Sequence, residues 1–382
     1  MPFLNSDKDD QKIRIYIALS RRHVLRLHRH RPRPRGHRHQ AALNQRGSLL
    51  IQELFVEYGT RVVQRYTAAI QQTAEMAVRN YLKKVAKERR QPLKAVEYLD
   101  DGTEIHLEVR IDGQTGSADF DFTGTDPETY GNRNAPASLV YSAIIYAVRA
   151  MINEEIPLIQ GCLSPINIII PPNTVLSPSS GAAVYTGNSL TSQRLTDVVF
   201  KAFETCAASQ GCMNSVQMYG GEKAKPGEPF AGFTFMYGET ICGGSGAGPT
   251  WRGVSAVHTN MTNTRVTDLE ILEKRYPVLV KQFSIRHGSG GEGLHPGGDG
   301  AIRAFEARAA MTFSLSSERR VHRPYRMAGG GPGKSGRNLA LLKLTDGRDR
   351  WVNVGRKGII QLKCGEQLFI HTPGGGGWGG AS

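Results

Sequence analysis

The sequence predicts an α+β fold in which a helical N-terminal part is followed by a β-rich, glycine-rich C-terminal part. Helical periodicity dominates the first half of the 382 residues, whereas alternating apolar and polar segments dominate the region after residue 277. Glycine is also concentrated in the C-terminal part, because 32 of the 44 glycines follow residue 219. Helices that precede strands, without regular alternation of the two, are typical of α+β proteins.

Four helices are predicted from apolar residues that recur every three or four positions. They span residues 48–58, 60–90, 138–153 and 191–208. Gly59 serves as the stop of the first helix, and Thr60 is the expected N-cap of the second. A short fifth helix begins at the Thr-x-x-Glu capping box of residues 267–270.

A β-hairpin is predicted at residues 105–122, where apolar and polar residues alternate on both sides of an Asp-Gly turn. Asp119 and Asp121 share one face of its second strand. A pair of catalytic carboxylates is conceivable there, but alternation alone places acids outward, so a solvated face is favoured. A buried strand is expected at residues 166–170. Seven later strands are expected at residues 278–286, 301–308, 311–316, 339–344, 351–354, 359–363 and 368–371.

Composition argues against a membrane partner and points to a cytoplasmic setting. No segment approaches the run of about 20 apolar residues that spans a bilayer. The five cysteines are too scattered for a disulfide framework, and no signal peptide precedes them. Reduced cysteines in a cytoplasmic protein are therefore expected.

Residues 1–42 form a basic segment that is separate in composition from residues 43–382. This segment holds 11 Lys and Arg against three Asp, which gives +8 of the chain's net charge of +14. Its Arg, His and Pro run has no hydrophobic period, so we do not expect it to fold alone. A nucleic-acid tail, an Arg-rich transit peptide and a non-native start of the chain remain open, and the last is favoured. Nucleic acid is not an expected partner of the rest.

Several short motifs match known sites only loosely. Residues 328–335 fit a relaxed phosphate-loop pattern, but Pro324 interrupts the entry and a strand-like segment follows where a helix is required. A glycine-rich turn is therefore favoured. Cys206 and Cys212 have no histidine pair nearby, which disfavours zinc, and Cys212 is interpreted as a small buried side chain instead of a nucleophile.

The densest polar constellation lies between residues 243 and 268. A glycine cluster there would let backbone N–H groups approach an oxyanion. Side chains that follow it supply a proton shuttle, a carboxylate clamp and amides that can orient a substrate. The candidates are Gly243, Gly244, Ser245 and Gly246 in the glycine cluster, His258 as the shuttle, Arg265 as the clamp, and Asn260 and Asn263 as the amides.

An alternative of equal weight is that these polar side chains satisfy loop backbone, with Thr267 or Asp268 as a helix cap. A second, weaker cluster contains Asn188 and Gln193 near a predicted helix start, where anions are favoured. Ordinary N-capping by Thr191 is the simpler explanation for that cluster.

Ten ordered sequence blocks resemble those of one enzyme family. They lie at residues 134–137, 156–162, 187–194, 207–212, 239–249, 258–265, 288–291, 297–300, 318–319 and 372–377. Together they are similar to the hydantoinase B/oxoprolinase family, and most similar to the C-terminal part of its eukaryotic-type oxoprolinases. The resemblance extends from about Leu43 to the C-terminus.

The resemblance implies an enzyme that opens 5-oxo-L-proline to L-glutamate at the expense of ATP, within glutathione turnover. It also implies a hydantoinase A-type domain or subunit as partner. That part binds ATP with Mg as co-substrate, at a site outside this chain, and phosphorylates the lactam oxygen. The B part, to which this chain corresponds, would complete the hydrolysis. A homo-oligomer is expected for the complete enzyme.

The same resemblance predicts that the chain is incomplete. The A part and the amino-terminal half of the B part have no counterpart here, and a bound metal, of unknown identity, would come through that half. We therefore expect the chain to need those parts for activity and to expose apolar surface without them. Alternatives are an N-methylhydantoinase or ketone carboxylase subunit of the same family, a non-catalytic scaffold for an A-type partner, and an RNA-binding module in the basic segment.

Overall fold

The computed structural model describes residues 35–89, 91–220 and 234–380, with side chains from residue 42 onward. The chain divides into two compact units, residues 1–70 and residues 71–382. Among the helices of the described residues, none combines the length and the hydropathy that crossing a bilayer requires.

The described part of the first unit consists of helix α2 (Arg35–Tyr58) and the beginning of α3 (Thr60–Glu88). The predicted break at Gly59 is confirmed, because this residue has a φ of 79° between the two helices. Two details differ from the prediction. α2 begins at Arg35, so the last residues of the basic segment are helical, while residues 1–34 lie outside the described part. Thr60 is itself helical, and the carbonyl of Gly59 accepts from the N–H of Val63 at the position expected of an N-cap.

Apolar side chains are exposed along both helices of the first unit. They are Leu43, Leu49, Leu50, Ile51, Leu54, Val56 and Tyr58 in α2, and Val62, Tyr66 and Ile70 in α3. A helix that packs against another element normally buries its apolar stripe, whereas these side chains are exposed.

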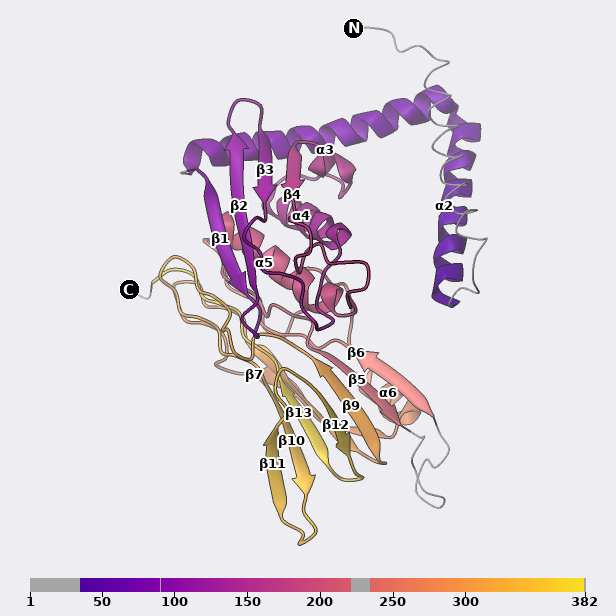
Figure 1. The fold of residues 1–382 in the computed structure, drawn as a ribbon, viewed down its shortest axis with the longest axis vertical. Coiled ribbons are helices and arrows are strands. Elements are labelled where there is room, and N and C mark those ends of the chain that lie inside the picture. Colours follow the sequence, from indigo (N-terminus) through magenta and orange to yellow (C-terminus); the bar gives the residue numbers. More distant parts are fainter. Residues whose placement is uncertain (1–34, 90, 221–233, 381–382) are drawn as a thin grey trace. The chain divides into compact units, whose positions relative to one another are not determined.

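The second unit contains two hydrophobic cores. The first core is built from α3 after residue 70, a four-stranded sheet and two further helices. The sheet has the order β1-β2-β3-β4, from β1 (Leu93–Tyr98), β2 (Glu104–Asp112), β3 (Ser117–Asp121) and β4 (Ile166–Ile169). Helix α5 (Ser192–Ala202) packs against β1 and β2, and α4 (Ala137–Met151) packs against α5 (Figure 1).

The predicted hairpin is confirmed, since β2 and β3 pair antiparallel with Asp112 opposite Ser117. Asp119 and Asp121 lie half-exposed on its outer face. The strand at residues 166–169 is not buried as predicted, because it forms the sheet edge parallel to β3 and leaves Ile169 exposed. The helix predicted for residues 191–208 ends at Ala202.

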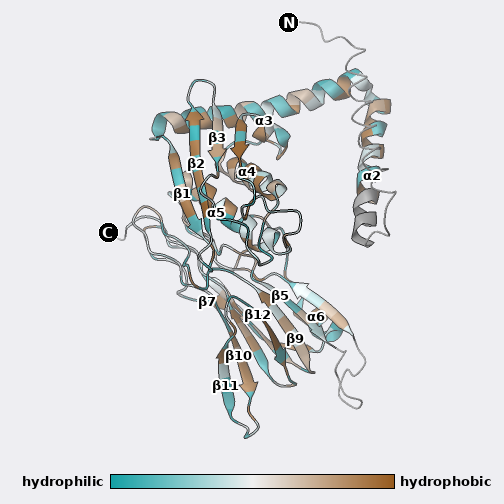
Figure 2. Ribbon diagram, in the orientation of Figure 1, coloured by the Kyte–Doolittle hydropathy of each residue, from teal (hydrophilic) through white to brown (hydrophobic). Residues whose placement is uncertain are grey.

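The second core lies between two antiparallel sheets that contain all seven predicted late strands. One sheet has the order β11 (Asp349–Asn353), β10 (Arg337–Lys343), β13 (Gln367–His371), β8 (Gly300–Ala307) and β7 (Val278–Arg286). The other has the order β12 (Lys357–Leu362), β9 (Met311–Ser316), β5 (Ser215–Gly220) and β6 (Phe235–Glu239). β1, β5 and β6 were not predicted. Brown apolar residues recur along α4 and along the strands of the sheets (Figure 2).

Short helices complete the second unit. The predicted helix after residue 267 is α6 (Leu269–Arg275), and its N-cap is Asp268, whose carboxylate accepts from the N–H groups of Glu270 and Ile271. The 3-10 helix η1 (Gln160–Leu163) precedes β4, and the π turn η2 (Gly187–Thr191) precedes α5. These short helices lie at the ends of the irregular segments that connect the longer elements.

Four glycine-rich segments lie side by side without forming a sheet. They are residues 243–248, 290–298, 329–333 and 374–377. Their backbones bond to one another directly, since the N–H of Gly291 donates to Gly375 and the N–H of Gly375 donates to Gly298. A Cβ atom at Gly244 would lie 1.9 Å from the carbonyl oxygen of Gly298. The approach of these backbones therefore requires glycine.

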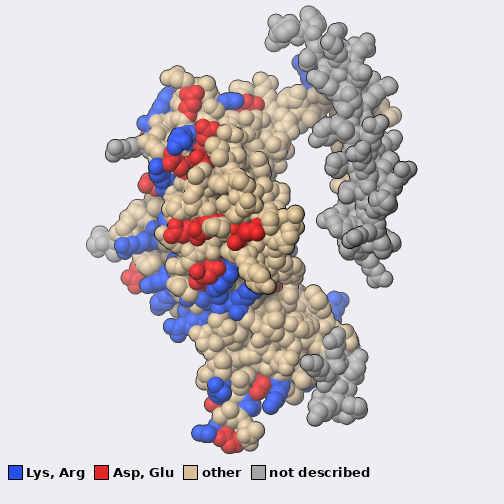
Figure 3. Space-filling view, in the orientation of Figure 1, with Lys and Arg blue, Asp and Glu red and all other residues tan. Residues whose placement is uncertain are grey.

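Positive charge is concentrated on part of the surface. In Figure 3, Lys and Arg side chains gather across the middle of the displayed face, with a smaller group of Asp and Glu among them. Elsewhere on that face the two signs are mixed. The excess of positive charge is therefore not confined to the basic N-terminal segment.

Candidate functional site

Three of the predicted site residues meet around residues 258–260. The backbones of Gly243 and Val257 exchange two hydrogen bonds, which fixes the start of this segment. From α5, the side chain of Gln193 donates from Nε2 to the carbonyl oxygen of Thr259 at 3.0 Å. Gln193 is thereby placed next to the two residues that flank Thr259 in sequence, which are His258 and Asn260.

Gln210 joins this group from the segment after α5. Its Oε1 atom lies only 2.0 Å from the place of a Cβ at Gly243, and it accepts from Nδ2 of Asn214 at 3.2 Å. We call the five side chains of Gln193, Gln210, His258, Thr259 and Asn260 the 258–260 cluster. Neither Gln210 nor Thr259 was predicted.

Each member of the 258–260 cluster carries a buried polar atom with no hydrogen-bond partner in the described part of the chain. These atoms are Oε1 of Gln193, Nε2 of Gln210, both ring nitrogens of His258, Oγ1 of Thr259 and Nδ2 of Asn260. A buried polar atom that lacks a partner costs about 1–3 kcal/mol. Such a concentration within one region marks a candidate site for a polar ligand.

The cluster offers donors and acceptors without formal charge. The amide NH₂ groups of Gln210 and Asn260 donate, Oε1 of Gln193 accepts, and a hydroxyl or a neutral imidazole can do either. A neutral amide has one N–H donor and one carbonyl acceptor, so it is complementary to this set. The arrangement therefore suits a neutral amide better than an anion.

The imidazole of His258 is held in its neutral form. Burial lowers its pKa below the ordinary value of 6.5, against the smaller opposing effect of Glu239. That carboxylate is itself occupied, because Arg303 donates to its two oxygens at 3.0 and 3.2 Å. A neutral imidazole keeps a lone pair, so His258 can accept a proton near pH 7.

The side chain of Asn260 is oriented by its backbone and by a tyrosine. Asn260 has a φ of 58°, a left-handed conformation that Asn tolerates better than most residues. The hydroxyl of Tyr146, from α4, donates to its Oδ1 atom at 3.5 Å. This contact leaves Nδ2 as the end of the amide for which the described residues provide no partner.

The backbone amides of the glycine cluster are engaged within the protein. Those of Gly243, Gly244 and Ser245 donate to the carbonyl oxygens of Val257, Pro373 and Val254, and that of Gly246 donates to Oγ of Ser209. The expected oxyanion donors are therefore unavailable in this arrangement, because the neighbouring segments already bind them. Gly243 contributes instead by allowing Gln210 to approach.

Three other predicted residues are exposed and stand apart from the cluster. Arg265, Asn263 and Asn188 are solvent-exposed, and no hydrogen bond or ion pair in the described residues joins their side chains to the 258–260 cluster. Thr191 stands at the predicted N-cap position of α5, but its side chain does not cap the helix. Its hydroxyl donates to the carbonyl oxygen of Arg133, and no side chain caps α5.

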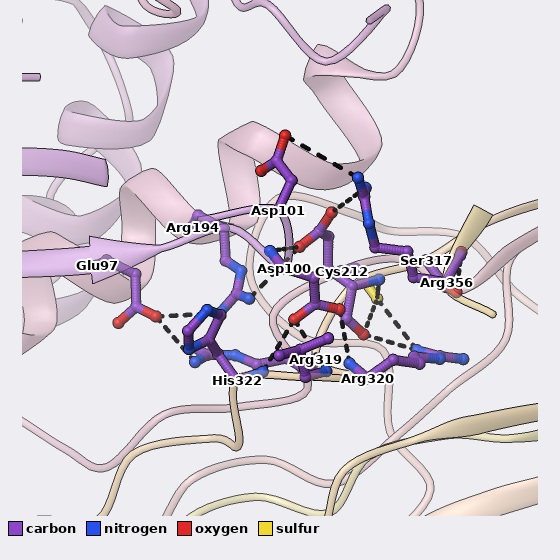
Figure 4. A network of polar contacts seen from close by, with 12 residues as sticks. Glu97, Asp100, Asp101, Arg194, Cys212, Ser317, Arg319, Arg320, His322 and Arg356 are labelled. Carbon is purple, nitrogen blue, oxygen red and sulfur yellow. Dashed lines mark hydrogen bonds and ion pairs between the residues drawn. The ribbon is translucent and has the colours of Figure 1, made fainter. Parts of the chain in front are cut away.

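A buried ion network fixes the N-terminal turn of α5, where Gln193 lies (Figure 4). The next residue, Arg194, is fully buried and donates to Glu97 of β1 at 3.1 Å. Arg319, from the segment after β9, donates to the same oxygen at 2.8 Å and to Asp197 at 2.6 Å. The network thus joins β1 and α5 of the first core to a segment of the second.

The same network continues through a second set of carboxylates. Asp100 accepts from the backbone amides of residues 320–322. Glu318 accepts from the amide of Asp100 at 2.6 Å and pairs with Arg356 at 3.2 Å. Of this network, Arg194, Glu318 and Arg319 belonged to recognised sequence blocks. The other members were not predicted, because the residues that they contact are far away in the sequence.

The pKa values of the two carboxylates bound by Arg319 are shifted in opposite directions. Burial raises the pKa of Asp197 to about 6, aided by the charge of Glu97. For Glu97, burial also acts upward, but Arg319 and Arg194 outweigh it and hold the pKa below the ordinary value. Glu97 is therefore the permanently charged centre of the network.

The loosely matched motifs do not form sites. Residues 329–336 lead into β10 instead of a helix, so the phosphate-loop requirement is not met. Cys212 is fully buried, and burial raises the pKa of its thiol, as expected of a structural cysteine. Among the described residues, no three His, Cys, Asp or Glu side chains are placed to hold a metal ion. Two surface cavities of about 530 and 550 Å³ have no lining residue from the cluster.

The comparisons with known proteins agree on one family. The family model described as Hydantoinase B/oxoprolinase matches residues 21–381. 5-Oxoprolinase 1 of Arabidopsis thaliana is 48% identical and the 5-oxoprolinase of Dictyostelium discoideum is 47% identical, each over 89% of this chain. The chain spans only 26% of the length of either relative.

Two solved structures share the fold at low sequence identity. The ATP-dependent caprolactamase of Pseudomonas jessenii superposes with a TM-score of 0.68 at 18% identity, covering 90% of this chain and 61% of that one. Nucleotide-free acetone carboxylase superposes with a TM-score of 0.66 at 16% identity, covering 86% and 50%. The mixed arrangement of N-terminal helices and C-terminal strands is therefore shared with both.

Proposed function

This chain belongs to the hydantoinase B/oxoprolinase family, and from that premise we propose that it is part of an ATP-dependent 5-oxoprolinase. In this proposal it contributes the residues that bind the cyclic amide during conversion of 5-oxo-L-proline to L-glutamate. ATP and Mg are supplied at an A-type part. The described residues of this chain have neither a phosphate loop nor a group of metal ligands, so no step is assigned to them there.

The single observation that supports the proposal is the uncharged 258–260 cluster. Oε1 of Gln193 is an acceptor for the ring N–H of a lactam, and Nδ2 of Asn260 is a donor for its carbonyl oxygen. Both atoms are buried, and neither has a hydrogen-bond partner among the residues that the structure describes. A lactam bound in this way would satisfy them together, which removes two desolvation penalties of about 1–3 kcal/mol each.

His258 is assigned as a proton acceptor in the hydrolysis. An amide resists water until its oxygen is converted to a better leaving group, which is the part of the reaction that ATP serves. Attack of water on the activated carbon releases a proton. A buried imidazole with a lowered pKa is neutral at pH 7 and can take that proton.

The test uses the complete enzyme, in which this chain is joined to the A-type part and to the amino-terminal half of the B part, and measures glutamate formed from 5-oxoproline and ATP. We expect Gln193→Leu to raise the KM for 5-oxoproline about tenfold, because a buried hydrogen bond is lost. We expect His258→Ala to lower kcat about 100-fold. Gln282→Leu is the matched control, because Gln282 is exposed on β7, outside the cluster.

An unchanged KM in a folded Gln193→Leu enzyme would remove Gln193 from the site. Turnover of hydantoins or ketones without turnover of 5-oxoproline would contradict the proposed substrate. Arg265, Asn263, Asn188 and the glycine cluster remain predicted contacts, and alanine variants of the three exposed side chains belong in the same assay.

A further inference from the structure

Four basic side chains meet at one end of the five-stranded sheet, apart from the 258–260 cluster. Arg286 ends β7, Arg337 begins β10, His371 ends β13, and Arg320 lies in the segment after β9. We call these four residues the arginine cluster. No motif in the sequence pointed to them, because they come from four separate segments.

Backbone contacts place the four side chains next to one another. Arg337 and His371 are direct partners across β10 and β13. Nη1 of Arg286 donates to the carbonyl oxygens of Ser335 at 2.8 Å and Thr372 at 3.0 Å, one on either side of that pair. A Cβ at Gly336 would lie 2.8 Å from the central carbon of the Arg320 guanidinium.

None of the three guanidinium groups has a carboxylate within ion-pair distance in the described part of the chain. This contrasts with the buried Arg194, Arg303 and Arg319, which are all paired. Arg286 and Arg320 bond only to neutral acceptors and a sulfur atom. Their positive charge is therefore not balanced locally.

The acidic groups that act on Arg286 and Arg320 are Asp299, Asp100 and Glu318, and each already has other partners. Glu318 accepts from the amide of Asp100 and pairs with Arg356. Asp299 accepts from the N–H groups of Ser289 and Gly290, both at 2.7 Å. Asp100 accepts from the amides of residues 320–322. Asp299 and Asp100 are therefore turned toward main chain, and none of the three carboxylates forms an ion pair with the arginine cluster.

Mutual repulsion acts on the pKa of two members. Burial lowers the pKa of His371, and Arg286, Arg337 and Arg320 lower it further. Burial also lowers the pKa of Arg286, with Arg337 and Arg320 acting in the same direction and Asp299 opposing. A bound anion would relieve this repulsion.

We propose that the arginine cluster binds a phosphate group. Guanidinium groups match the geometry of phosphate through paired N–H donors, and a dianion would offset the unpaired charge. Arg337 is exposed, and Arg286 and His371 are half-exposed, so a ligand can reach them. Arg320 lies behind them and contributes charge. Inorganic phosphate and the phosphates of a nucleotide share this chemistry, and the proposal does not depend on the identity of the cyclic amide.

Titration calorimetry of the purified 382-residue chain tests the site, with sodium phosphate in one arm and ADP without Mg in the other. Sodium chloride at matched ionic strength is the blank. We expect saturable binding of phosphate, weakened about fivefold or more by Arg337→Gln. Arg350→Gln is the matched control, because Arg350 is an exposed arginine on β11 of the same sheet. It should leave the affinity within about twofold.

A second readout reports on the site directly. In a proton NMR titration, phosphate should raise the pKa of His371 by about half a unit or more, because an anion stabilises the imidazolium. His371→Gln identifies the resonance. Tighter binding of ADP than of phosphate would assign the site to a nucleotide, and equal or weaker binding would assign it to free phosphate. Binding no stronger than the chloride blank, or unchanged in Arg337→Gln, would overturn the proposal.

Discussion

Removing Arg319 should destabilise the second unit severely. Only 1% of the Arg319 side chain is exposed, and it holds Glu97 and Asp197 at 2.8 and 2.6 Å. Arg319→Ala leaves two buried carboxylates without this partner. Loss of one member of a buried ion pair costs about 3–5 kcal/mol, and hydrogen bonds to charged groups contribute about 1.5–3 kcal/mol each. The first route predicts a loss of about 3–5 kcal/mol, and the two hydrogen bonds together predict about 3–6 kcal/mol.

The assay is urea-induced unfolding followed by circular dichroism, with Arg348→Ala as the matched control. Arg348 pairs with Asp346, but 78% of its side chain is exposed, so its loss should cost at most about 1 kcal/mol. If the two variants lose similar stability, the buried network contributes no more to the free energy of unfolding than an exposed ion pair does. Arg319→Met combined with Asp197→Asn should recover part of the loss, because the uncompensated charge is then removed.

The network also predicts a pH dependence with a definite sign. The pKa of Asp197 is about 6 in the folded protein, above its ordinary value of 3.8. The folded state therefore binds more protons between these values. The contribution of Asp197 to stability is present below about pH 4 and is lost as the pH rises through 6. Comparing the urea midpoints of the wild type and Asp197→Asn between pH 4 and 7 measures this contribution, and a difference that does not change with pH would contradict it.

The remaining predictions concern the glycine segments, a histidine and two thiols. Gly244→Ala should lower the melting temperature strongly or prevent folding, whereas Gly181→Ala should be nearly neutral, because a Cβ there meets nothing within 4 Å. The pKa of His258 measured by NMR should be below 6.5, and a value of 6.5 or above would contradict the burial of its ring. Iodoacetamide should modify the exposed Cys364 rapidly and Cys212 only after unfolding, as mass spectrometry of the digested protein would show.

The sequence predicted those strands whose own residues alternate clearly. β9 begins and ends at the predicted residues, because side-chain period and burial coincide along it. β7 also has the predicted bounds, although most of its residues are exposed. β5 and β6 were missed, since their short segments contain Gly and Met and owe their position to pairing with β9 and with each other. Tertiary pairing, which local pattern does not contain, decides such strands.

The candidate site was predicted in part for a similar reason. His258, Asn260 and Gln193 were recognised because their residue types suggest chemistry. The glycine cluster was interpreted as a set of free donors, but its amides are bound by segments far away in sequence, such as Pro373 for Gly244. Whether an N–H group is free depends on the fold, so residue type alone cannot decide it.

The four glycine segments have a consequence for the local opening of this protein. They carry no regular strand assignment and so resemble loops, which usually exchange their amide hydrogens quickly. Here neighbouring main chains bind those hydrogens, as the N–H of Gly377 is bound by the carbonyl of Gly331. Deuterium uptake in these stretches should be as slow as in the central strands, so the least regular part of the second unit would be among the last to open.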